Sequence, residues 1–308
     1  YKIQSILSLK KVLSSTKGPY FILGGGSNLL VSKDQNSIFL KNEIIGIEIV
    51  EEDDENVIIK VGGGENWHQL VLWTLQHDYG GLENLTLIPG TVCASPIQII
   101  GAYGVELDQV FVRLEAVHLK EQSLVTFTKD ECQFDYRNSI FKNELRGQYF
   151  ITSVYFILTK KNHKINISYA PLAARFSETP TIQDVSKAII EIRESKLPNP
   201  RVLGNSGSFF KNPIIPVSAY EKLKKKYPNV PSYSVDDKHV KVPAGWLIEQ
   251  AGWKGRRIGD AGCYEKQALV LVNHGKATGE EIWDFAQKII EDVDAKFGIR
   301  LSPEVNVI

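Results

Sequence analysis

The sequence feature that most constrains the fold is a run of three glycines. Gly24, Gly25 and Gly26 follow the apolar run YFIL and precede SNLL. Glycines allow successive backbone amides to converge on an anion, because no Cβ stands in the way. A nucleotide phosphate site is therefore one hypothesis, and a tight turn between two strands is the alternative.

Two familiar phosphate-binding motifs do not match this run. A dinucleotide fingerprint needs glycine at its first, third and sixth positions, and Leu29 occupies the sixth. A P-loop ends in Gly-Lys-Ser or Gly-Lys-Thr, and neither triplet occurs in the sequence. If the run binds a phosphate, it does so within another kind of site.

A second glycine-rich segment, LIPGTVCASPIQIIGAYGVEL at residues 87–107, favours a ligand. It combines small residues and turns with apolar side chains throughout. Such a segment suits a backbone that lies close along a flat ligand. A long structural loop is the alternative interpretation.

Charge and length limit the classes of partner. The 308 residues suffice for two or three domains, and 36 basic residues balance 36 acidic ones. A net charge of zero gives no indication of nucleic acid, and no apolar run approaches the roughly 18 residues of a membrane span. The three cysteines are far apart, which fits a reducing compartment and no metal site. We expect a cytoplasmic protein, monomeric and without a membrane or nucleic-acid partner, that binds a small molecule.

Helix-like and strand-like segments alternate along the chain without a fixed repeat. The expected strands cover residues 44–50, 56–61, 113–127 and 149–158. The expected helices cover residues 1–13, the stretch from residue 67 to the glycines at 80–81, the stretch from Thr181 to Pro198, and the stretch from Gly279 to Gly298. The acidic run EEDDE is expected to form the tip of a hairpin.

Eight sequence blocks resemble one enzyme family. They occur in the order GGGSNLL, ENLTLIPGTVCASPIQIIGAYGVEL, DYRNSIFK, ESKLPNP, GNSGSFFKNP, PAGWLIEQAGWKG, KQALVLVNHG and LSPEVNVI. Together they resemble the bacterial UDP-N-acetylenolpyruvoylglucosamine reductases, flavoenzymes that complete UDP-N-acetylmuramate for peptidoglycan and so for cell-wall synthesis. The insertion between the fifth and sixth blocks resembles the type of these enzymes with a mobile, tyrosine-bearing substrate lid.

The resemblance implies an α+β fold. It would consist of a two-lobed FAD-binding domain of the vanillyl-alcohol-oxidase type and a C-terminal α+β substrate-binding domain. Residues 1–45 would form the first lobe, without the short strand that precedes this position in the family. Residues 46–197 and 299–308 would form the second lobe, and residues 198–298 the substrate-binding domain.

The implied reaction is the NADPH-dependent reduction of an enolpyruvyl ether by way of FAD. Hydride reaches the terminal carbon of the vinyl group, and a proton reaches the neighbouring carbon. By resemblance, Arg137 binds the substrate carboxylate, a task suited to a guanidinium that pairs bidentately. Ser208 would donate the proton and Glu304 would polarise the enolate carboxyl. Without the resemblance, Arg137 would be interpreted as a surface arginine, Ser208 as a turn serine and Glu304 as a surface glutamate.

The remaining site residues also follow from the resemblance. The expected FAD contacts are Gly24, Gly25, Gly26, Ser27, Asn28, Pro89, Gly90, Ser95, Pro96, Gly101, Ala102, Tyr103 and Gly104. The expected contacts with the UDP-sugar are Tyr169, Lys196, Asn212, Tyr233, Lys241 and Gln267. NADPH would use the same cleft as the substrate, which explains the lack of a separate dinucleotide motif.

Two residues depart from the family pattern within the flavin segment. Cys93 stands where the family usually has glycine, and Ile99 where it usually has asparagine. Cys93 is expected to weaken FAD binding if its side chain lies close to the pyrophosphate. Two alternatives remain open at this point: a related FAD-dependent oxidase, and a non-catalytic protein that binds flavin or a UDP-sugar.

Overall fold

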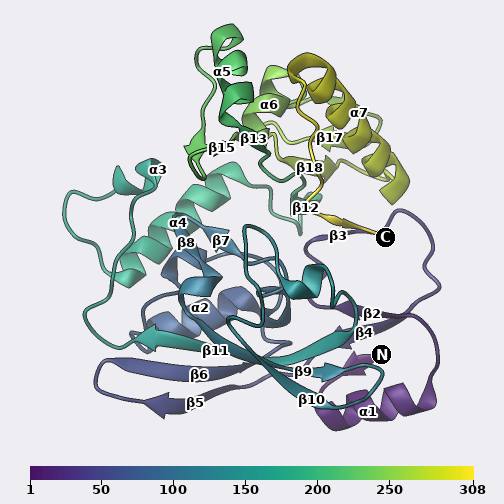
Figure 1. Cartoon of the computed structure of the whole chain (residues 1–308), viewed down its shortest axis with the longest axis vertical. Coiled ribbons are helices and arrows are strands. Elements are labelled where there is room, and N and C mark those ends of the chain that lie inside the picture. The colour runs from purple at the N-terminus through teal and green to yellow at the C-terminus, as the bar shows by residue number, and fades with distance from the viewer. The chain divides into compact units, whose positions relative to one another are not determined.

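The computed structural model describes all residues from 1 to 308, and the chain forms two compact units. The first unit comprises residues 1–26 and 36–193, and the second comprises residues 27–35 and 194–308 (Figure 1). The chain therefore passes between the units three times. Residues 299–308 belong with residues 194–298 in this division, whereas the boundaries of the three expected domains stay predictions.

A small parallel sheet begins the first unit. Its strands have the order β1 (Lys2–Ile3), β4 (Ile38–Asn42) and β2 (Tyr20–Leu23). Helix α1 (Ile6–Ser15) starts with a capping box between Ser5 and Ser8, and its Leu9 packs with Ile3 and Leu40. This confirms the amphipathic helix predicted near the beginning of the chain, although it starts at residue 6.

A five-stranded antiparallel sheet forms the centre of the first unit. Its order is β10 (Leu124–Thr128), β9 (Phe111–His118), β11 (Tyr149–Thr159), β6 (Asn56–Gly62) and β5 (Ile47–Glu52). Alternate residues of β6, among them Val57, Ile59 and Val61, are completely buried, because successive side chains of a strand point to opposite faces. The predicted β5–β6 hairpin is confirmed, whereas the stretch expected as one strand, residues 113–127, is a pair of strands.

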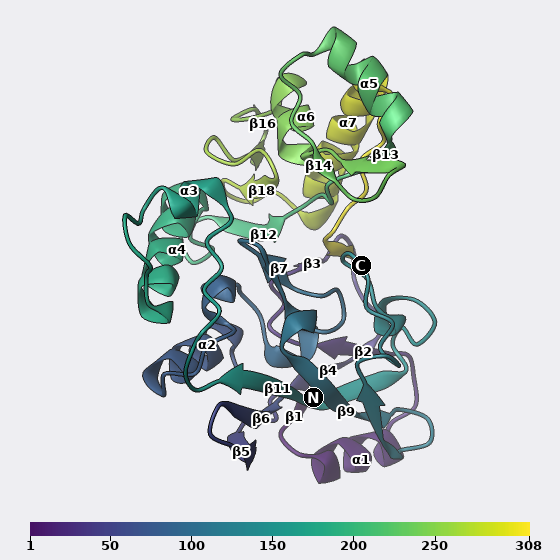
Figure 2. The ribbon, with the colours of Figure 1, turned by 60° about the vertical axis from the view of Figure 1, so that its left-hand side comes forward.

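Two helices contribute to the hydrophobic packing of the first unit. Helix α2 (Trp67–Gln76) lies beside β11 and β6 (Figure 2). It buries Trp67 and Leu70 in the same core as residues of these strands. Helix α4 (Ile182–Lys196) begins where the Thr181 hydroxyl accepts a hydrogen bond from the Asp184 amide at 3.1 Å. The first unit also contains a hairpin of β7 (Gly101–Ala102) and β8 (Val105–Glu106) and the short helix α3 (Ala170–Ala173).

The second unit has two small antiparallel sheets with their own core. One has the order β12 (Gly204–Ser208), β18 (Val270–Asn273), β17 (Ala261–Cys263) and β16 (Arg257–Ile258). The other has the order β13 (Ile214–Pro216), β15 (His239–Lys241) and β14 (Tyr233–Ser234). The second unit also contains three helices, which contribute to its core: α5 (Val217–Lys226), α6 (Ala244–Gln250) and α7 (Gly279–Phe297).

Helix α7 follows its sequence signals closely. Thr278 and Glu281 form a capping box at its start, and Gly298 ends it in the left-handed conformation with φ +65°. Its buried face includes Ile282, Phe285 and Ile289, as the spacing of its apolar residues predicts. No helix in the structure is both long enough and apolar enough to cross a membrane.

The end of the described chain joins a segment near its beginning. Strand β19 (Asn306–Val307) pairs in parallel with β3 (Leu29–Leu30), directly after the glycine run. The Ser32 hydroxyl also donates a hydrogen bond to the Ile308 carbonyl at 2.8 Å. Residues 27–35 are thereby held in the second unit.

Candidate active site

The glycine run after β2 lies against the second glycine-rich segment. A Cβ on Gly25 would lie 2.8 Å from the Cα of Gly90, and a Cβ on Gly24 would lie 2.5 Å from the hydroxyl oxygen of Thr91. Gly26 and Gly90 also have positive φ angles, +69° and +108°. The two loops therefore meet backbone to backbone at Gly25 and Gly90, whereas Gly24 faces the side chains of Thr91 and Cys93. The contact forms a cradle with main chain at Gly25 and Gly90, as an anion held by amides requires.

Cys93 packs beneath this cradle. Its side chain is 4% exposed, and its thiol lies 3.4 Å from the Thr91 hydroxyl. Burial raises the pKa of the Cys93 thiol, so the side chain stays neutral. The thiol is a packing group of the first unit, and its effect on cofactor affinity stays a prediction.

The DYRNS loop binds the segment that follows the cradle. The Arg137 guanidinium donates hydrogen bonds to the carbonyls of Ile99 at 2.5 Å and Gly101 at 2.8 Å. Arg137 and Ile99 both have positive φ angles, +53° and +47°. A left-handed conformation is uncommon for any residue with a Cβ and is strained for a β-branched one, so both backbones are held by their surroundings.

Tyr103 is the centre of a polar cluster. It has φ +51°, and its carbonyl accepts a hydrogen bond from the side-chain amide of Asn84 at 2.8 Å. Its ring meets the Tyr169 ring edge-on, with 5.2 Å between the ring centroids. Arg193 hydrogen bonds to the Tyr103 side chain. Burial lowers the pKa of Arg193 and raises that of Tyr103, with each group partly offsetting the shift of the other.

Two buried polar atoms of this cluster have no hydrogen-bond partner within the protein. They are the amide oxygen of Asn84 and the Nε of Arg193. Buried polar atoms are nearly always satisfied, so these two atoms mark a place where a polar ligand or a water would supply the missing hydrogen bonds. Asn84 was not predicted as a site residue, because a polar residue beside Glu83 and Thr86 gives no signal of its own in the sequence.

The other predicted FAD contacts do not all lie in the same unit. The Ser95 side chain is buried, and its hydroxyl donates to the Val92 carbonyl at 2.7 Å within the short helix η2 (Val92–Ala94). A Cβ on Gly104 would lie 2.7 Å from the Ser168 hydroxyl oxygen. Ser27 and Asn28 fall in the second unit, where the Asn28 carbonyl accepts a hydrogen bond from the Asn306 amide at 3.1 Å.

In the second unit, a bulge separates two serines that a regular strand would place on one face. The pairing of β12 with β18 shifts between Asn205 and Ser208, and Gly207 there has φ +72°. The Ser206 hydroxyl donates to the Leu29 carbonyl at 3.2 Å, whereas Ser208 is exposed. Ser208 thus resumes the pairing, opposite Val270, after a bulge that contains Ser206 and Gly207.

Glu304 lies on the strand-like segment beside the end of β12. Its amide donates to the carbonyl of Phe209 at 2.8 Å, and Pro303 bridges to Phe210. Phe209 directly follows Ser208, so two of the three predicted catalytic residues come from adjacent stretches of backbone. Arg137, the third, belongs to the first unit.

Four predicted substrate contacts gather around the start of α6. Tyr233 and Lys241 are opposite each other in the pairing of β14 with β15. The Asn212 side-chain oxygen accepts a hydrogen bond from the Ala244 amide at 2.9 Å, and the Gln267 oxygen would lie 3.4 Å from a Cβ on Gly245. Lys196 is exposed at the end of α4, and Tyr169 belongs to the first unit.

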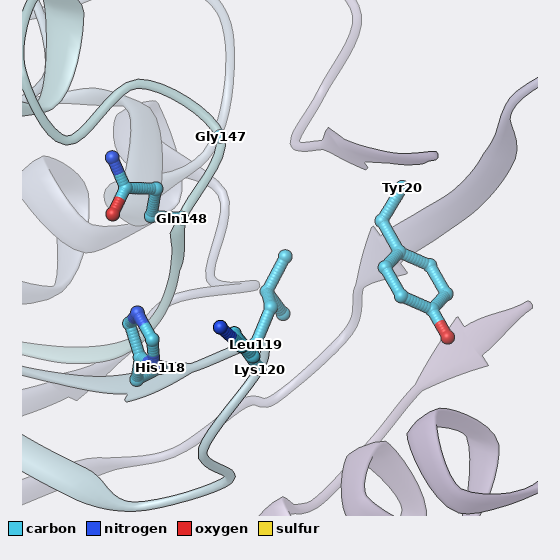
Figure 3. Close-up of a pocket in the computed structure, with 6 residues that line it drawn as sticks. All are labelled: Tyr20, His118, Leu119, Lys120, Gly147 and Gln148. Atoms are coloured by element: carbon cyan, nitrogen blue, oxygen red, sulfur yellow. The ribbon is translucent and has the colours of Figure 1, made fainter. Parts of the chain in front are cut away.

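A separate cavity of ≈ 380 Å³ in the first unit contains no predicted site residue. It is lined by Tyr20, His118, Leu119, Lys120, Gly147 and Gln148 (Figure 3). The Tyr20 hydroxyl donates to the Thr16 carbonyl at 2.8 Å, and His118 Nδ1 accepts from the Glu121 amide at 3.1 Å. These polar groups already serve local turns. The structure has no group of three or more histidine, cysteine or acidic residues suited to a metal ion.

The part of the chain that carries the backbone cradle is similar to the FAD-binding domain of flavoproteins. A family model described as an FAD binding domain matches residues 2–126, which include both glycine-rich loops. A second model, described as the C-terminal domain of UDP-N-acetylenolpyruvoylglucosamine reductase, matches residues 199–308.

Relatives over nearly the whole chain define the family. A UDP-N-acetylenolpyruvoylglucosamine reductase of Flavobacterium johnsoniae is 51% identical over 99% of this chain and 92% of its own length. That of Chromobacterium violaceum is 45% identical over 94% and 86%. The chain belongs to the UDP-N-acetylenolpyruvoylglucosamine reductase family. It is an FAD-dependent oxidoreductase.

A solved structure supports the fold. The crystal structure of the UDP-N-acetylenolpyruvylglucosamine reductase of Thermus caldophilus matches 99% of this chain and 90% of its own, with a TM-score of 0.67 and 22% identity. The α+β fold, with an FAD-binding domain followed by a C-terminal domain of this family, is thereby confirmed.

Proposed function

We propose that this protein reduces UDP-N-acetylenolpyruvoylglucosamine to UDP-N-acetylmuramate, a step of peptidoglycan precursor synthesis, with NADPH as the source of electrons. Membership of the family supports the substrate and FAD. The observation that carries the mechanism is the bulge that exposes Ser208 beside the Glu304 segment. We further propose that the enzyme works as a cytoplasmic monomer.

The residues around the cradle fit FAD in two respects. The loops of Gly25 and Gly90 approach so closely that only main chain lines the contact, as a pyrophosphate seat demands. The segment from Ser95 to Gly104 then continues as an apolar stretch for a ring system. Bound FAD supplies the hydride for the vinyl carbon of the substrate.

The protein side chains carry the remaining chemistry. In this proposal Arg137 pairs with the substrate carboxylate through its guanidinium, which holds the enolpyruvyl group and disperses the charge that develops there. Ser208 Oγ gives its proton to the carbon next to the vinyl carbon, a transfer that depends on fixed geometry because a hydroxyl is a weak acid. Glu304 polarises the carboxyl of the same intermediate.

The nucleotide part of the substrate would bind at the start of α6. Lys241 and Lys196 supply positive charge for the diphosphate, and Asn212 and Gln267 supply amide groups for hydrogen bonds. Tyr233, 57% exposed, and Tyr169, 37% exposed, present aromatic rings that are accessible to a ligand. In this proposal the two tyrosines close over the nucleotide.

Separate half-reactions test the proposal. We expect NADPH to bleach the flavin absorbance of the purified enzyme, and UDP-N-acetylenolpyruvoylglucosamine to restore it without oxygen. Ser208→Ala should bleach at the wild-type rate but recover at least 100-fold more slowly, since general acid catalysis contributes about 10²–10⁴ in rate. Stopped-flow absorbance measures both rates.

Ser206→Ala is the matched control, because its hydroxyl bonds the Leu29 carbonyl rather than facing solvent. We expect both half-reactions of this variant to remain close to those of the wild type. Recovery by oxygen but never by the enolpyruvyl substrate would identify an oxidase instead. Equal losses in the two serine variants would remove Ser208 from its proposed role.

A further inference from the structure

Three alternate carbonyls of the flavin segment receive hydrogen bonds from side chains of the DYRNS loop. Ser139 Oγ donates to the Ile97 carbonyl at 2.5 Å. Arg137 donates through Nη1 to Ile99 and through Nη2 to Gly101. We name this set of contacts, from Ser139 and Arg137 to residues 97, 99 and 101, the carbonyl clamp.

The loop itself is shaped to deliver these groups. Asp135 and Asn138 exchange two backbone hydrogen bonds, of 3.1 and 2.9 Å, around a tight turn whose central residues are Tyr136 and Arg137. Arg137 has φ +53° at a turn position where glycine or asparagine is usual. Residues held in such conformations persist only where the surrounding structure over-determines them, and they cluster at functional sites.

The segment that receives the hydrogen bonds is strained as well. Ile99 is buried and has φ +47°, a conformation costly for a β-branched side chain. A Cβ on Gly101 would lie 3.4 Å from Arg137 Nη1, so the guanidinium rests directly on this glycine. The amides of Ile97 and Ile100 bond to the carbonyls of Ala94 and Ser95, so main-chain bonds fold the segment's start while the side-chain bonds hold its carbonyls.

We propose that Arg137 is a positioning residue for the flavin as well as a ligand of the substrate: through the carbonyl clamp it holds residues 97–101 in the shape that seats the isoalloxazine ring. Hydrogen bonds from a guanidinium to two carbonyls are charge-assisted and fix the angle between the groups, which a lysine ammonium cannot reproduce. This inference rests on the proposed placement of the flavin ring along residues 95–104.

The test measures FAD affinity in the absence of NADPH and substrate, so it does not depend on the proposed reaction. Arg137→Gln should weaken FAD binding about 10- to 100-fold, because both charge-assisted bonds are lost. The FAD affinity of Arg137→Lys should lie between that of Arg137→Gln and that of the wild type. Release of FAD on dilution of the holoenzyme, followed by flavin fluorescence, gives the dissociation constants, and the visible absorbance bands of bound FAD should shift in Arg137→Gln.

Ser139→Ala separates the clamp from substrate binding. Its hydroxyl contacts the Ile97 carbonyl and has no role in the proposed chemistry, so its loss should weaken FAD binding roughly 2- to 10-fold. Arg146→Gln is the matched control, because Arg146 is an exposed arginine of the same connection; it should bind FAD like the wild type.

Unchanged FAD affinity and an unchanged flavin spectrum in both Arg137→Gln and Ser139→Ala would overturn the inference and leave Arg137 with substrate alone. An equal loss in Arg146→Gln would also overturn it, because the effect would then be one of net charge. If Arg137→Gln fails to fold, Arg137→Lys and Ser139→Ala decide the question by the same measurement. A wild-type enzyme that binds FAD but reduces no enolpyruvyl substrate would contradict the proposed function and leave the clamp result interpretable.

Discussion

At the scale of single residues, Gly25 shows how the cradle depends on a missing side chain. In Gly25→Ala the new methyl group would sit 2.8 Å from the Cα of Gly90, and backbone atoms cannot yield as a flexible side chain does. We expect the two loops to separate and FAD affinity to fall at least tenfold. Fluorescence titration with FAD checks this.

Gly18→Ala provides a control for that variant. Its Cβ would meet only the far end of the Ile38 side chain, at 3.4 Å, and Gly18 has no positive φ angle. This substitution should leave FAD affinity unchanged. Wild-type affinity in Gly25→Ala would show that the loops tolerate separation and that the cradle is not the cofactor seat.

The partly buried carboxyl of Glu115 should make the stability of the protein depend on pH. Glu115 accepts hydrogen bonds from Lys60, Tyr155 and Ser153. Burial alone would raise the pKa of Glu115, but these bonds outweigh it and keep the pKa below the usual 4.5. A carboxyl whose folded-state pKa is lowered contributes stability above its unfolded pKa, and this contribution is lost as the pH falls below about 4.5.

Lys60→Met should therefore be less stable than the wild type at pH 7, and the difference should shrink as the pH falls below about 4.5 and Glu115 becomes protonated. Urea unfolding at several pH values measures it. Lys11→Met, at an exposed lysine of α1, should show neither effect. A stability difference that does not change with pH would mean that Lys60 acts through packing alone.

The residue types at the site were predictable, but their geometry was not. The three glycines indicated a ligand loop, yet contact with Gly90 arises from a segment that lies far along the chain. Ser206 and Ser208 are two residues apart, which in a regular strand places both on one face. Only the bulge at Gly207 separates them, and a bulge depends on the partner strand rather than on local sequence.

At the scale of elements, the C-terminal cap of α7 offers a clean test of backbone strain. Gly298 has φ +65°, and a Cβ there would meet no atom within 4 Å. Gly298→Ala should lower the free energy of unfolding by about 1 kcal/mol, since only the left-handed conformation opposes the change. Thermal unfolding checks this, and a variant as stable as the wild type would show that the helix end relaxes at no cost.

Elements defined by local signals were the ones predicted correctly. Thr181 and Pro198 bracket α4, and Gly298 caps α7. Helix α2 was predicted as well, but it ends at Gln76, before the glycines that were expected to stop it. Most of the shorter strand pairs escaped prediction, two of them for a clear physical reason. The pairings of β1 with β4 and of β3 with β19 join strands of at most five residues across long stretches of chain, so no periodicity could form within them.

At the scale of the whole molecule, each unit has its own hydrophobic core. Trp67, Val154 and Phe156 belong to that of the first unit, and Phe209, Trp253 and Phe285 to that of the second. The proposed pyrophosphate and ring seats lie mainly in the first unit. FAD at 100 times its dissociation constant should stabilise the state that binds it by about 2.7 kcal/mol.

Hydrogen exchange measured by mass spectrometry should therefore show more added protection from FAD in peptides of α2 and residues 87–104 than in peptides of α7. The difference is expected because the two units have separate hydrophobic cores, so the first can open without the second. Equal added protection in α7 would show instead that the two units unfold as one cooperative body. Exchange of the apoprotein gives the reference.

The pairing of β3 with β19 has a consequence for how the protein is made. Asn306 bonds to the carbonyl of Asn28, 278 residues earlier in the chain. At about 5–20 residues per second, a ribosome needs on the order of 15–60 s to span that interval. During that time residues 27–35 have left the ribosome together with the glycine run, but the strand with which β3 pairs has not yet been synthesised. A nascent chain interrupted before residue 306 thus lacks the strand that pairs with β3, so this part of the second unit cannot form until residues 306–307 have been synthesised.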